Sequence, residues 1–406
     1  MPANKGEGRT RLGRFVPLLL AAQLGWSIPN NAASALLQAG SSTIAPNDKI
    51  GFYATMSTIG AILAVVAIIL GGALSDRTRT RFGKRIPWII GGSVLATLGL
   101  FSTGLTTNPV LVIAGFALYQ MALNAMLGAI FALTPDYLAQ SVLGRASAVS
   151  GAGVLLGGIL GGIISAIFIT VPQQGLMIIP WLILIAAIVL GIFLPPRPNV
   201  DEARESLSLL GFLKYLRPPK DGQFWWVFAG RFLFILALFM TVQYQYFIAT
   251  EYLGLETQAA GNLLALTSIV LAICAGAATL VAGPLSDRIG RKPFVIGAPL
   301  MAAVGVLPLI FAHQPWALVV FFVLGGLAYG GYLSVDAALM VEVLPNQEST
   351  AKDLAVLNAA NSLPLVFAPA LAGLLVTIGG YQGSFIATVV TAVAGAVCIF
   401  FVKRVR

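Results

Sequence analysis

Two oppositely charged residues fall inside long apolar stretches of this 406-residue sequence. Asp336 lies toward the end of the stretch 317–341, and Arg231 lies near the start of the stretch 225–249. If these stretches cross a lipid bilayer, a bare charge inside them costs at least ~2.5 kcal/mol and seldom persists without a partner. We therefore expect Asp336 and Arg231 to form an ion pair. The carboxylate of Asp336 is the first candidate for a group that takes up and releases a proton.

Uncharged polar residues recur at helical spacing in other apolar stretches. Between residues 23 and 38 they follow one another at steps of three or four, and similar groups occur near residues 120, 244, 330 and 360. Amides and phenols both donate and accept hydrogen bonds, and an aromatic face can cover the C–H surface of a sugar. This chemistry favours a neutral polyhydroxylated ligand. The alternative is that about half of these side chains join neighbouring helices, at ~0.6 kcal/mol per pair.

The elements that must position these groups are membrane-spanning helices. Hydrophobic residues make up 58% of the chain and charged residues 10%, against roughly 25% charged in soluble domains. The apolar stretches approach the ~20 residues that cross a bilayer as a helix. We predict an all-α membrane protein with twelve transmembrane helices, at residues 16–37, 52–74, 88–106, 110–133, 146–169, 176–194, 225–249, 259–282, 294–312, 317–341, 354–378 and 383–402.

Lysine and arginine indicate the orientation of these helices, because positive residues are retained on the cytoplasmic side. With the N-terminus inside, Lys49 is the one basic residue expected outside, and Arg231 is within a helix. The protein is then expected in the inner (plasma) membrane, with both termini in the cytoplasm. The net charge of +9 reflects this topology and contact with anionic lipid headgroups, not nucleic-acid binding. The polar segment 195–224 is a predicted linker between an N-terminal bundle, 1–194, and a C-terminal bundle, 225–406.

The two halves repeat a local sequence. Residues 72–87 read GALSDRTRTRFGKRIP, and residues 283–293 read GPLSDRIGRKP. Each segment follows the second predicted helix of its half. Such duplication is typical of transporters assembled from parallel repeats.

These repeated segments resemble the loop motif between the second and third helices of the major facilitator superfamily. The longer text from Leu74 to Trp88 is similar to glycoside-pentoside-hexuronide cation symporters and sucrose-transporter-like proteins, as are the segments 23–26 and 334–339. The resemblance implies two six-helix bundles related by a pseudo-two-fold axis. It also implies a secondary active transporter that moves a small polar solute, such as a sugar or glycoside, together with protons by alternating access.

The resemblance further implies roles for residues on particular helices. Side chains from the helices that line the cavity of this superfamily, and some of their neighbours, would bind substrate: Gln23, Trp26, Asn30, Tyr119, Gln120, Asn124, Gln243, Tyr244, Tyr329, Tyr332, Asn358 and Asn361. The repeated loops would form a conformational latch from Gly72, Asp76, Arg77, Arg85, Asp136, Gly283, Asp287, Arg288, Arg291 and Glu342.

In that latch, Asp76 would face the N-terminus of the eleventh helix, in the opposite half, and Asp287 would face that of the fifth. Arg77 and Arg288 would pair with nearby acids. Gly72 would remove a side chain where two helices touch. The alternative is that the basic residues serve only to fix topology.

Other functions have less support from the residues. Sodium coupling lacks a carboxylate in the stretch 52–70, and glycines 144, 153, 157, 161 and 162 approach an antiporter motif that has proline where Gly158 stands. A proton-driven drug or metabolite exporter is the alternative transporter, and a substrate sensor that moves nothing is a third possibility. One histidine and two separated cysteines favour neither an enzyme nor a metal or cofactor site. We expect a monomer.

The latch hypothesis yields a first prediction. Replacing Asp76→Asn removes the charge expected to hold the cytoplasmic side closed, so accessibility labelling of the purified protein should shift toward the inward-open pattern. A labelling pattern identical to that of the unsubstituted protein would reject the latch.

Overall fold

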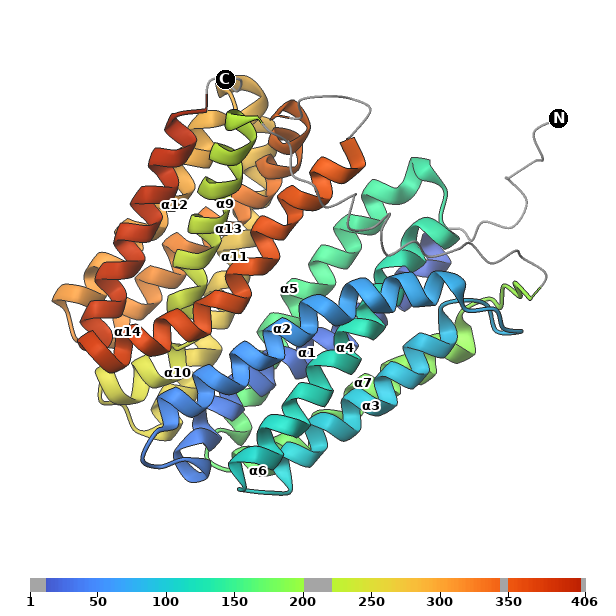
Figure 1. Cartoon of the computed structure of the whole chain (residues 1–406), viewed down its shortest axis with the longest axis horizontal. Helices are drawn as coiled ribbons and strands as arrows, with labels where there is room; N and C mark the ends of the chain where they lie inside the picture. The colour runs from blue at the N-terminus through green and yellow to red at the C-terminus, as the bar shows by residue number, and fades with distance from the viewer. Residues whose placement is uncertain (1–11, 201–220, 344–349, 403–406) are drawn as a thin grey trace. The chain divides into compact units, whose positions relative to one another are not determined.

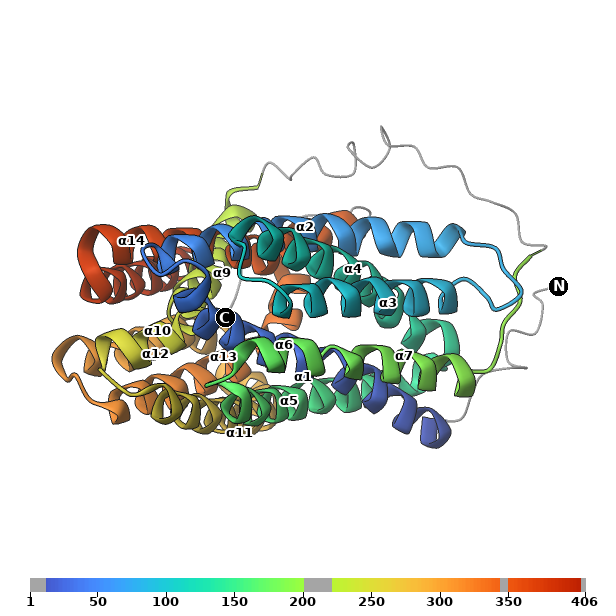
Figure 2. The same cartoon turned by 90° about the horizontal axis from the view of Figure 1, so that it is seen from below.

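A computed structural model describes residues 12–200, 221–343 and 350–402. Within these ranges it leaves the side chains of residues 14, 337–343, 350–356 and 358 undescribed. The described residues form helices joined by short turns (Figures 1 and 2). In chain order the first helices are α1 (Leu12–Ile44), α2 (Lys49–Arg77), α3 (Ile86–Gly104), α4 (Pro109–Tyr137), the 3₁₀ turn η1 (Gln140–Val142), α5 (Leu143–Phe168), α6 (Pro172–Ile178) and α7 (Trp181–Phe193).

The second half of the chain continues in the same manner. Its elements are α9 (Gly222–Val242), α10 (Gln245–Phe247), the π-helical turn η2 (Ile248–Tyr252), α11 (Thr257–Ile289), α12 (Lys292–Phe311), α13 (Pro315–Val343) and α14 (Thr350–Phe400). The last of these bends at Gly380, whose φ of 66° and ψ of −174° interrupt the helix. A positive φ of this kind is readily adopted only by glycine.

The predicted fold class is confirmed. Ten helical segments in the described residues are long and apolar enough to cross a membrane. α1 is not among these ten, because polar side chains such as Gln23, Asn30 and Gln38 interrupt its apolar surface. α14 counts once although Gly380 divides it into two helical segments. Adding α1 and separating α14 gives the twelve spans expected from the sequence.

Two predicted helices are interrupted in the structure. The stretch 176–194 lies in α6 and α7, which are separated at Ile179 and Pro180, since proline cannot donate the hydrogen bond that would continue α6. The stretch 225–249 ends as an α-helix at Val242. Beyond it, the rings of Tyr244 and Phe247 pack against Tyr53, so tertiary contacts override the continuous apolar pattern.

Contacts between residues divide the chain into two compact units. Unit 1 comprises residues 1–44 and 59–205, and unit 2 comprises residues 45–58 and 206–406. The start of α2 belongs to unit 2 because Lys49 Nζ lies 2.7 Å from Glu251 Oε1, in addition to the Tyr53 contacts. The boundary after residue 205 falls within the predicted linker. The predicted bundles themselves, 1–194 and 225–406, remain predictions.

Unit 1 is held together by close helix crossings at glycines. α1 packs along α5, and α3 packs along α4. A Cβ atom added to Gly153 would lie 2.8 Å from Gln23 Cβ, and one added to Gly161 would lie 2.8 Å from the Ile28 carbonyl oxygen. At Gly157 it would overlap the Ser27 hydroxyl. The glycine stripe of α5 therefore has a packing function, as small residues commonly do between membrane helices.

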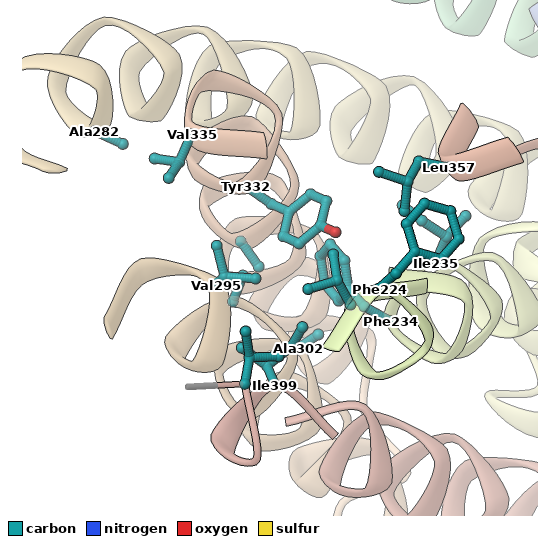
Figure 3. Packing of buried hydrophobic residues seen from close by; sticks show 14 residues of the cluster. Phe224, Phe234, Ile235, Ala282, Val295, Ala302, Tyr332, Val335, Leu357 and Ile399 are labelled. Carbon is teal, nitrogen blue, oxygen red and sulfur yellow. The ribbon is translucent and has the colours of Figure 1, made fainter. Parts of the chain in front are cut away.

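Unit 2 has two sets of packed helices around an apolar cluster. α9 packs along α14, and both α11 and α12 pack along α13 (Figure 1). The cluster includes Phe224 and Phe234 from α9, Tyr332 from α13, and Leu357 and Ile399 from α14 (Figure 3). A Cβ atom added to Gly230 would lie 2.5 Å from Ile399 Cδ1, so this glycine permits the close approach of α9 and α14.

The α1–α5 crossing yields a matched pair of substitutions. Gly157→Ala should destabilise the protein by ~1–3 kcal/mol, because the added methyl group overlaps Ser27. Gly158→Ala should be neutral or stabilise by up to ~0.5 kcal/mol, because its Cβ meets nothing within 4 Å and alanine favours the helix. Thermal unfolding in detergent measures both. Equal midpoints for the two variants would contradict the crossing described here.

Candidate functional site

A buried ion pair joins two helices of unit 2. Arg231 Nη2 from α9 lies 2.8 Å from Asp336 Oδ2 on α13, and the side chains are 1% and 4% exposed. The predicted ion pair is therefore confirmed. Breaking one partner of such a pair leaves a desolvated charge, which is costly when the environment is apolar. The pair thus fixes the position of α9 relative to α13.

A third helix contributes to this cluster. Arg231 Nε donates a hydrogen bond of 2.7 Å to Asn361 Oδ1 on α14. The guanidinium group is planar and presents its donors in a fixed fork, so it can hold a carboxylate and an amide at the same time. Arg231 consequently connects α9, α13 and α14. The amide of Asn361, predicted to bind substrate, is engaged by the protein itself.

One donor and one acceptor of this cluster make no hydrogen bond of standard geometry in the described residues, although the two side chains interact with each other. They are the hydroxyl group of Tyr332 and Oδ1 of Asp336, both buried, and the two residues lie one helical turn apart on α13. The ring of Tyr332 packs on Phe234 at 4.7 Å between centroids (Figure 3). Buried polar atoms are normally satisfied, so an unsatisfied pair is a candidate for binding a proton or a ligand group.

In unit 1 the predicted polar residues are brought together on α1 and α4. Trp26 Nε1 donates to Gln23 Oε1 at 2.7 Å, and the Tyr119 hydroxyl donates to Asn30 Oδ1 at 3.4 Å. Tyr119 is fully buried, whereas Trp26 and Asn30 are half-buried. The second bond connects α1 with α4. The Tyr119–Asn30 bond therefore holds the two helices together, while Trp26 and Asn30 remain partly accessible.

The remaining predicted binding residues occupy different environments. Gln120 and Asn124 are half-buried, and Asn124 Nδ2 donates to the Gln120 carbonyl oxygen at 2.8 Å. The buried hydroxyl of Tyr244 donates to the Pro369 carbonyl oxygen at 2.7 Å, a contact that stabilises the packing of unit 2. Three residues complete the set: Gln243 caps the end of α9, Tyr329 packs edge-on against Phe239, and the side chain of Asn358 lies outside the described residues.

Part of the predicted latch forms a charge cluster in unit 1. Arg85 Nη2 lies 2.6 Å from Asp76 Oδ1, and Arg85 Nε lies 2.8 Å from Asp136 Oδ2. Its Nη1 also donates to Ser75 Oγ at 3.1 Å. Lys84 adds a longer contact of 3.4 Å to Asp136. Since Asp136 belongs to α4, the cluster ties the turn between α2 and α3 to the end of α4.

Two expectations about this latch are corrected by the structure. A Cβ atom added to Gly72 would meet nothing within 4 Å, whereas one added to Gly71 would lie 2.5 Å from Ala125 Cα. The backbone of Gly72 lies at the crossing of α2 with α4, since a Cβ atom added to Gly128 would lie 2.7 Å from the Gly72 amide nitrogen, but the missing side chains that permit this contact are those of Gly71 and Gly128. Arg77 makes no ion pair in the part of the chain that the structure describes, because Arg85 and Lys84 occupy the nearby acids.

The second repeat lies in an exposed turn of unit 2. Asp287 Oδ1 lies 3.8 Å from Arg291 one turn further, and its side chain is 70% exposed. A Cβ atom on Gly283 would meet nothing within 4 Å. Arg288 is exposed, and the Glu342 side chain lies outside the described residues. Exposed pairs of this kind contribute ~0–1 kcal/mol.

Arg197 and Asn199, in the segment after α7, make contacts within unit 1 that the sequence did not indicate. Asn199 Oδ1 accepts the Thr80 amide at 3.1 Å, and Asn199 Nδ2 donates to the Thr78 carbonyl at 2.9 Å. The guanidinium of Arg197 lies 4.3 Å from the ring centroid of Tyr137. No periodic pattern marks these residues, which are in the predicted linker. They hold the turn between α2 and α3 against the start of that linker.

A multi-pass helical membrane protein with a buried ion pair and no enzymatic site predicted from its sequence has the features of a transporter. The family comparison establishes the class. The model of the Major Facilitator Superfamily matches residues 15–277 and 247–406, and the chain belongs to this superfamily of transporters.

Two relatives that align with part of this chain carry different names. The MFS transporter asaE of Aspergillus flavus is 27% identical over 320 residues, which cover 73% of this chain and 66% of that protein. The gentisate transporter of Corynebacterium glutamicum is 36% identical over 69 residues, or 17% of this chain and 16% of the relative. The alignments thus cover less than two thirds of both relatives' length.

A solved structure has the same fold. It is a bacterial homologue of the human lysosomal transporter Spinster, in an inward-facing and unoccupied conformation. The TM-score is 0.74 at 16% identity, and the match covers 97% of this chain and 98% of the other.

The charge cluster of unit 1 yields a prediction that contrasts two arginines. Arg85→Gln should lower the free energy of unfolding by about 2 kcal/mol, less than the ~3–5 kcal/mol of a fully buried pair because Asp76 is exposed. Arg77→Gln should change it by less than ~0.5 kcal/mol. Thermal or denaturant unfolding in detergent measures both. A larger effect at Arg77 would contradict the contacts assigned to Arg85.

Proposed function

We propose that this transporter is a secondary active symporter that carries a small polar solute, a sugar or glycoside, together with protons. The observation that carries the proposal is the buried Asp336 carboxylate, which is paired through Oδ2 with Arg231 and makes no hydrogen bond of standard geometry at Oδ1 among the described residues. An ionisable group at this depth of a membrane helix is a functional candidate because its charge is costly there.

Proton binding would change the contacts of Asp336 in a defined way. A proton on Oδ1 neutralises the carboxylate and weakens its attraction to Arg231. Arg231 would keep its hydrogen bond to Asn361, so the link between α9 and α14 would persist while the link to α13 loosens. Loss of the proton restores the ion pair. Protonation of Asp336 would thus favour one arrangement of α9, α13 and α14, and loss of the proton would favour the other. Coupling of proton binding to a conformational change requires such a shift.

The substrate class rests on the polar groups of α1 and α4. Gln23, Trp26, Asn30, Gln120 and Asn124 are uncharged, and all but Gln23 are half-buried. Several already satisfy one another through hydrogen bonds, so a ligand that both donates and accepts could exchange with these bonds at little cost. A polyhydroxylated solute has this property. The loop text shared with sugar:cation symporters points in the same direction.

The alternative, a drug or metabolite exporter, rested on the glycines of α5. Gly153, Gly157 and Gly161 pack against α1, which accounts for the stripe without an antiporter role. A short stretch of similarity to a gentisate transporter leaves a carboxylated solute as the other substrate class to test. We further propose that the protein acts as a monomer. We also propose that it lies in the plasma membrane with both termini in the cytoplasm, the orientation that the distribution of basic residues favours.

The test uses purified protein in proteoliposomes. Monosaccharides, disaccharides and aromatic acids are first screened by thermal shift, since a bound substrate stabilises the folded state by mass action. Substrate-induced proton uptake is then recorded with an internal pH-sensitive dye. Asp336→Asn should abolish proton uptake and accumulation driven by a pH gradient but retain exchange of labelled substrate. Asp48→Asn, an exposed acid that accepts the Gly51 amide, is the control and should behave like the unsubstituted protein.

Asp336→Glu guards against a folding defect, because it keeps a carboxylate for Arg231. It should retain proton uptake with altered pH dependence. Normal pH-driven accumulation by Asp336→Asn would refute the coupling assignment. Stabilisation and exchange by aromatic acids alone would refute the sugar assignment.

A further inference from the structure

An apolar groove runs along unit 2 between α11 and α12, with α13 as its floor. Both α11 and α12 pack along α13, yet they scarcely contact each other. The space has a volume of about 540 Å³, within the ~300–1,000 Å³ of ligand-binding pockets. Its lining includes Ala278 and Val281 from α11, Gly297 and Met301 from α12, and Tyr332 from α13.

Small residues create the groove. Ala277, Ala278 and Ala282 line one wall, Gly297 and Ala298 line the other, and Ala328 and Gly331 are on the floor. A Cβ atom added to Gly297 would meet nothing within 4 Å, so the glycine leaves space that no other side chain fills. An apolar groove of this size favours an apolar occupant over water.

The groove is open on the side of the membrane helices that carries exposed apolar residues. Val281 is 61% exposed, Ile289 is 60% exposed and Met301 is 37% exposed. In a membrane-spanning chain, exposed apolar side chains at this position face lipid. Hydrocarbon chains of the bilayer are therefore the molecules with direct access to the groove.

One end of the groove is basic. Ile289 and Pro293 line that end, and they directly follow Arg288 and Lys292 in the chain. Arg288 is exposed, and Arg291 lies 3.8 Å from Asp287. The Lys292 ammonium group donates to the Val402 carbonyl oxygen and lies 5.7 Å from the Phe400 ring. Arg288 and Lys292 therefore place positive charge beside an apolar slot.

We propose that this groove binds an anionic phospholipid, with an acyl chain between α11 and α12 and the headgroup beside Arg288. Charge complementarity selects this occupant, because basic residues at a membrane surface attract anionic headgroups and repel lipophilic cations. Apolar burial of the chain supplies the remaining affinity. The binding site is separate from the polar groups of α1 and α4.

The groove is adjacent to the buried charge cluster through one shared residue. The ring of Tyr332 forms part of the floor, while in Figure 3 its hydroxyl points away from Ala282, which lines the α11 wall. An acyl chain in the groove would contact this ring, which also packs on Phe234, and restrict its motion. Asp336 lies one turn further along α13.

The experiment measures lipid retention by native mass spectrometry of the full chain released from detergent. Phosphatidylglycerol and phosphatidylcholine with identical acyl chains are the probes. Phosphatidylglycerol should be retained preferentially, and Gly297→Leu should lower retention by about tenfold because leucine fills the groove. Ala277→Leu, on the opposite wall, should act in the same direction and serves if the first variant folds poorly. Arg288→Gln should reduce the preference for phosphatidylglycerol by about fivefold, the effect of one basic residue.

Matched controls come from the first repeat. Gly91 follows Pro87 at the same spacing as Gly297 follows Pro293, and its Cβ would also meet nothing within 4 Å. Gly91→Leu and Arg77→Gln should leave retention unchanged. Equal retention of both lipids, or equal loss in the variants and their controls, would overturn the proposal. Displacement of phosphatidylglycerol by a lipophilic cation but not by added anionic lipid would also overturn it and assign the groove to another ligand.

Discussion

Lipid offers no hydrogen bonds to the polypeptide backbone, and this constraint determines most of what the structure does. Most backbone amides and carbonyls are therefore satisfied within their own helices, so contacts between helices depend mainly on side chains. Because the surroundings are as apolar as leucine, burial of apolar groups gives little preference for one arrangement of helices. Specific contacts must provide that preference. In this chain they are glycine crossings and a small number of polar or charged pairs.

The glycines and the charges work together at one crossing of unit 2. Gly230 lets α9 approach the end of α14 closely, and its neighbour Arg231 reaches Asn361 on the earlier part of the same element. The same guanidinium group holds Asp336 on α13. Three helices therefore depend on one buried cation. A proton on Asp336 changes the strength of one of its two contacts, and this change would be transmitted to a helix without rearranging the apolar core.

The sequence predicted the helices and this ion pair because both follow from strong constraints. Runs of apolar residues must span the bilayer, and two opposite charges within such runs must find each other. The sequence could not show that the space for a side chain is missing at Gly71 and not at Gly72, since a shift of one residue moves a side chain to a different helix face. Nor could it show that Arg85, and not Arg77, pairs with Asp76 and Asp136. Nor could it indicate that the hydroxyl of Tyr244 is taken by the Pro369 carbonyl. That contact depends on the kink after Val242, which tertiary packing produces.

The two repeated segments have similar sequences but make different contacts. Gly83 and Gly290 occupy equivalent positions, and both have positive φ values, 85° and 100°, so the turn itself is shared. In unit 1 the arginine after this turn reaches Asp76 and Asp136 and secures the end of α4. In unit 2 the corresponding Lys292 instead donates to Val402, at the end of the chain that the structure describes. Arg288 is exposed beside an open apolar groove, whereas the turn in unit 1 is held by the ion pairs of Arg85 with Asp76 and Asp136.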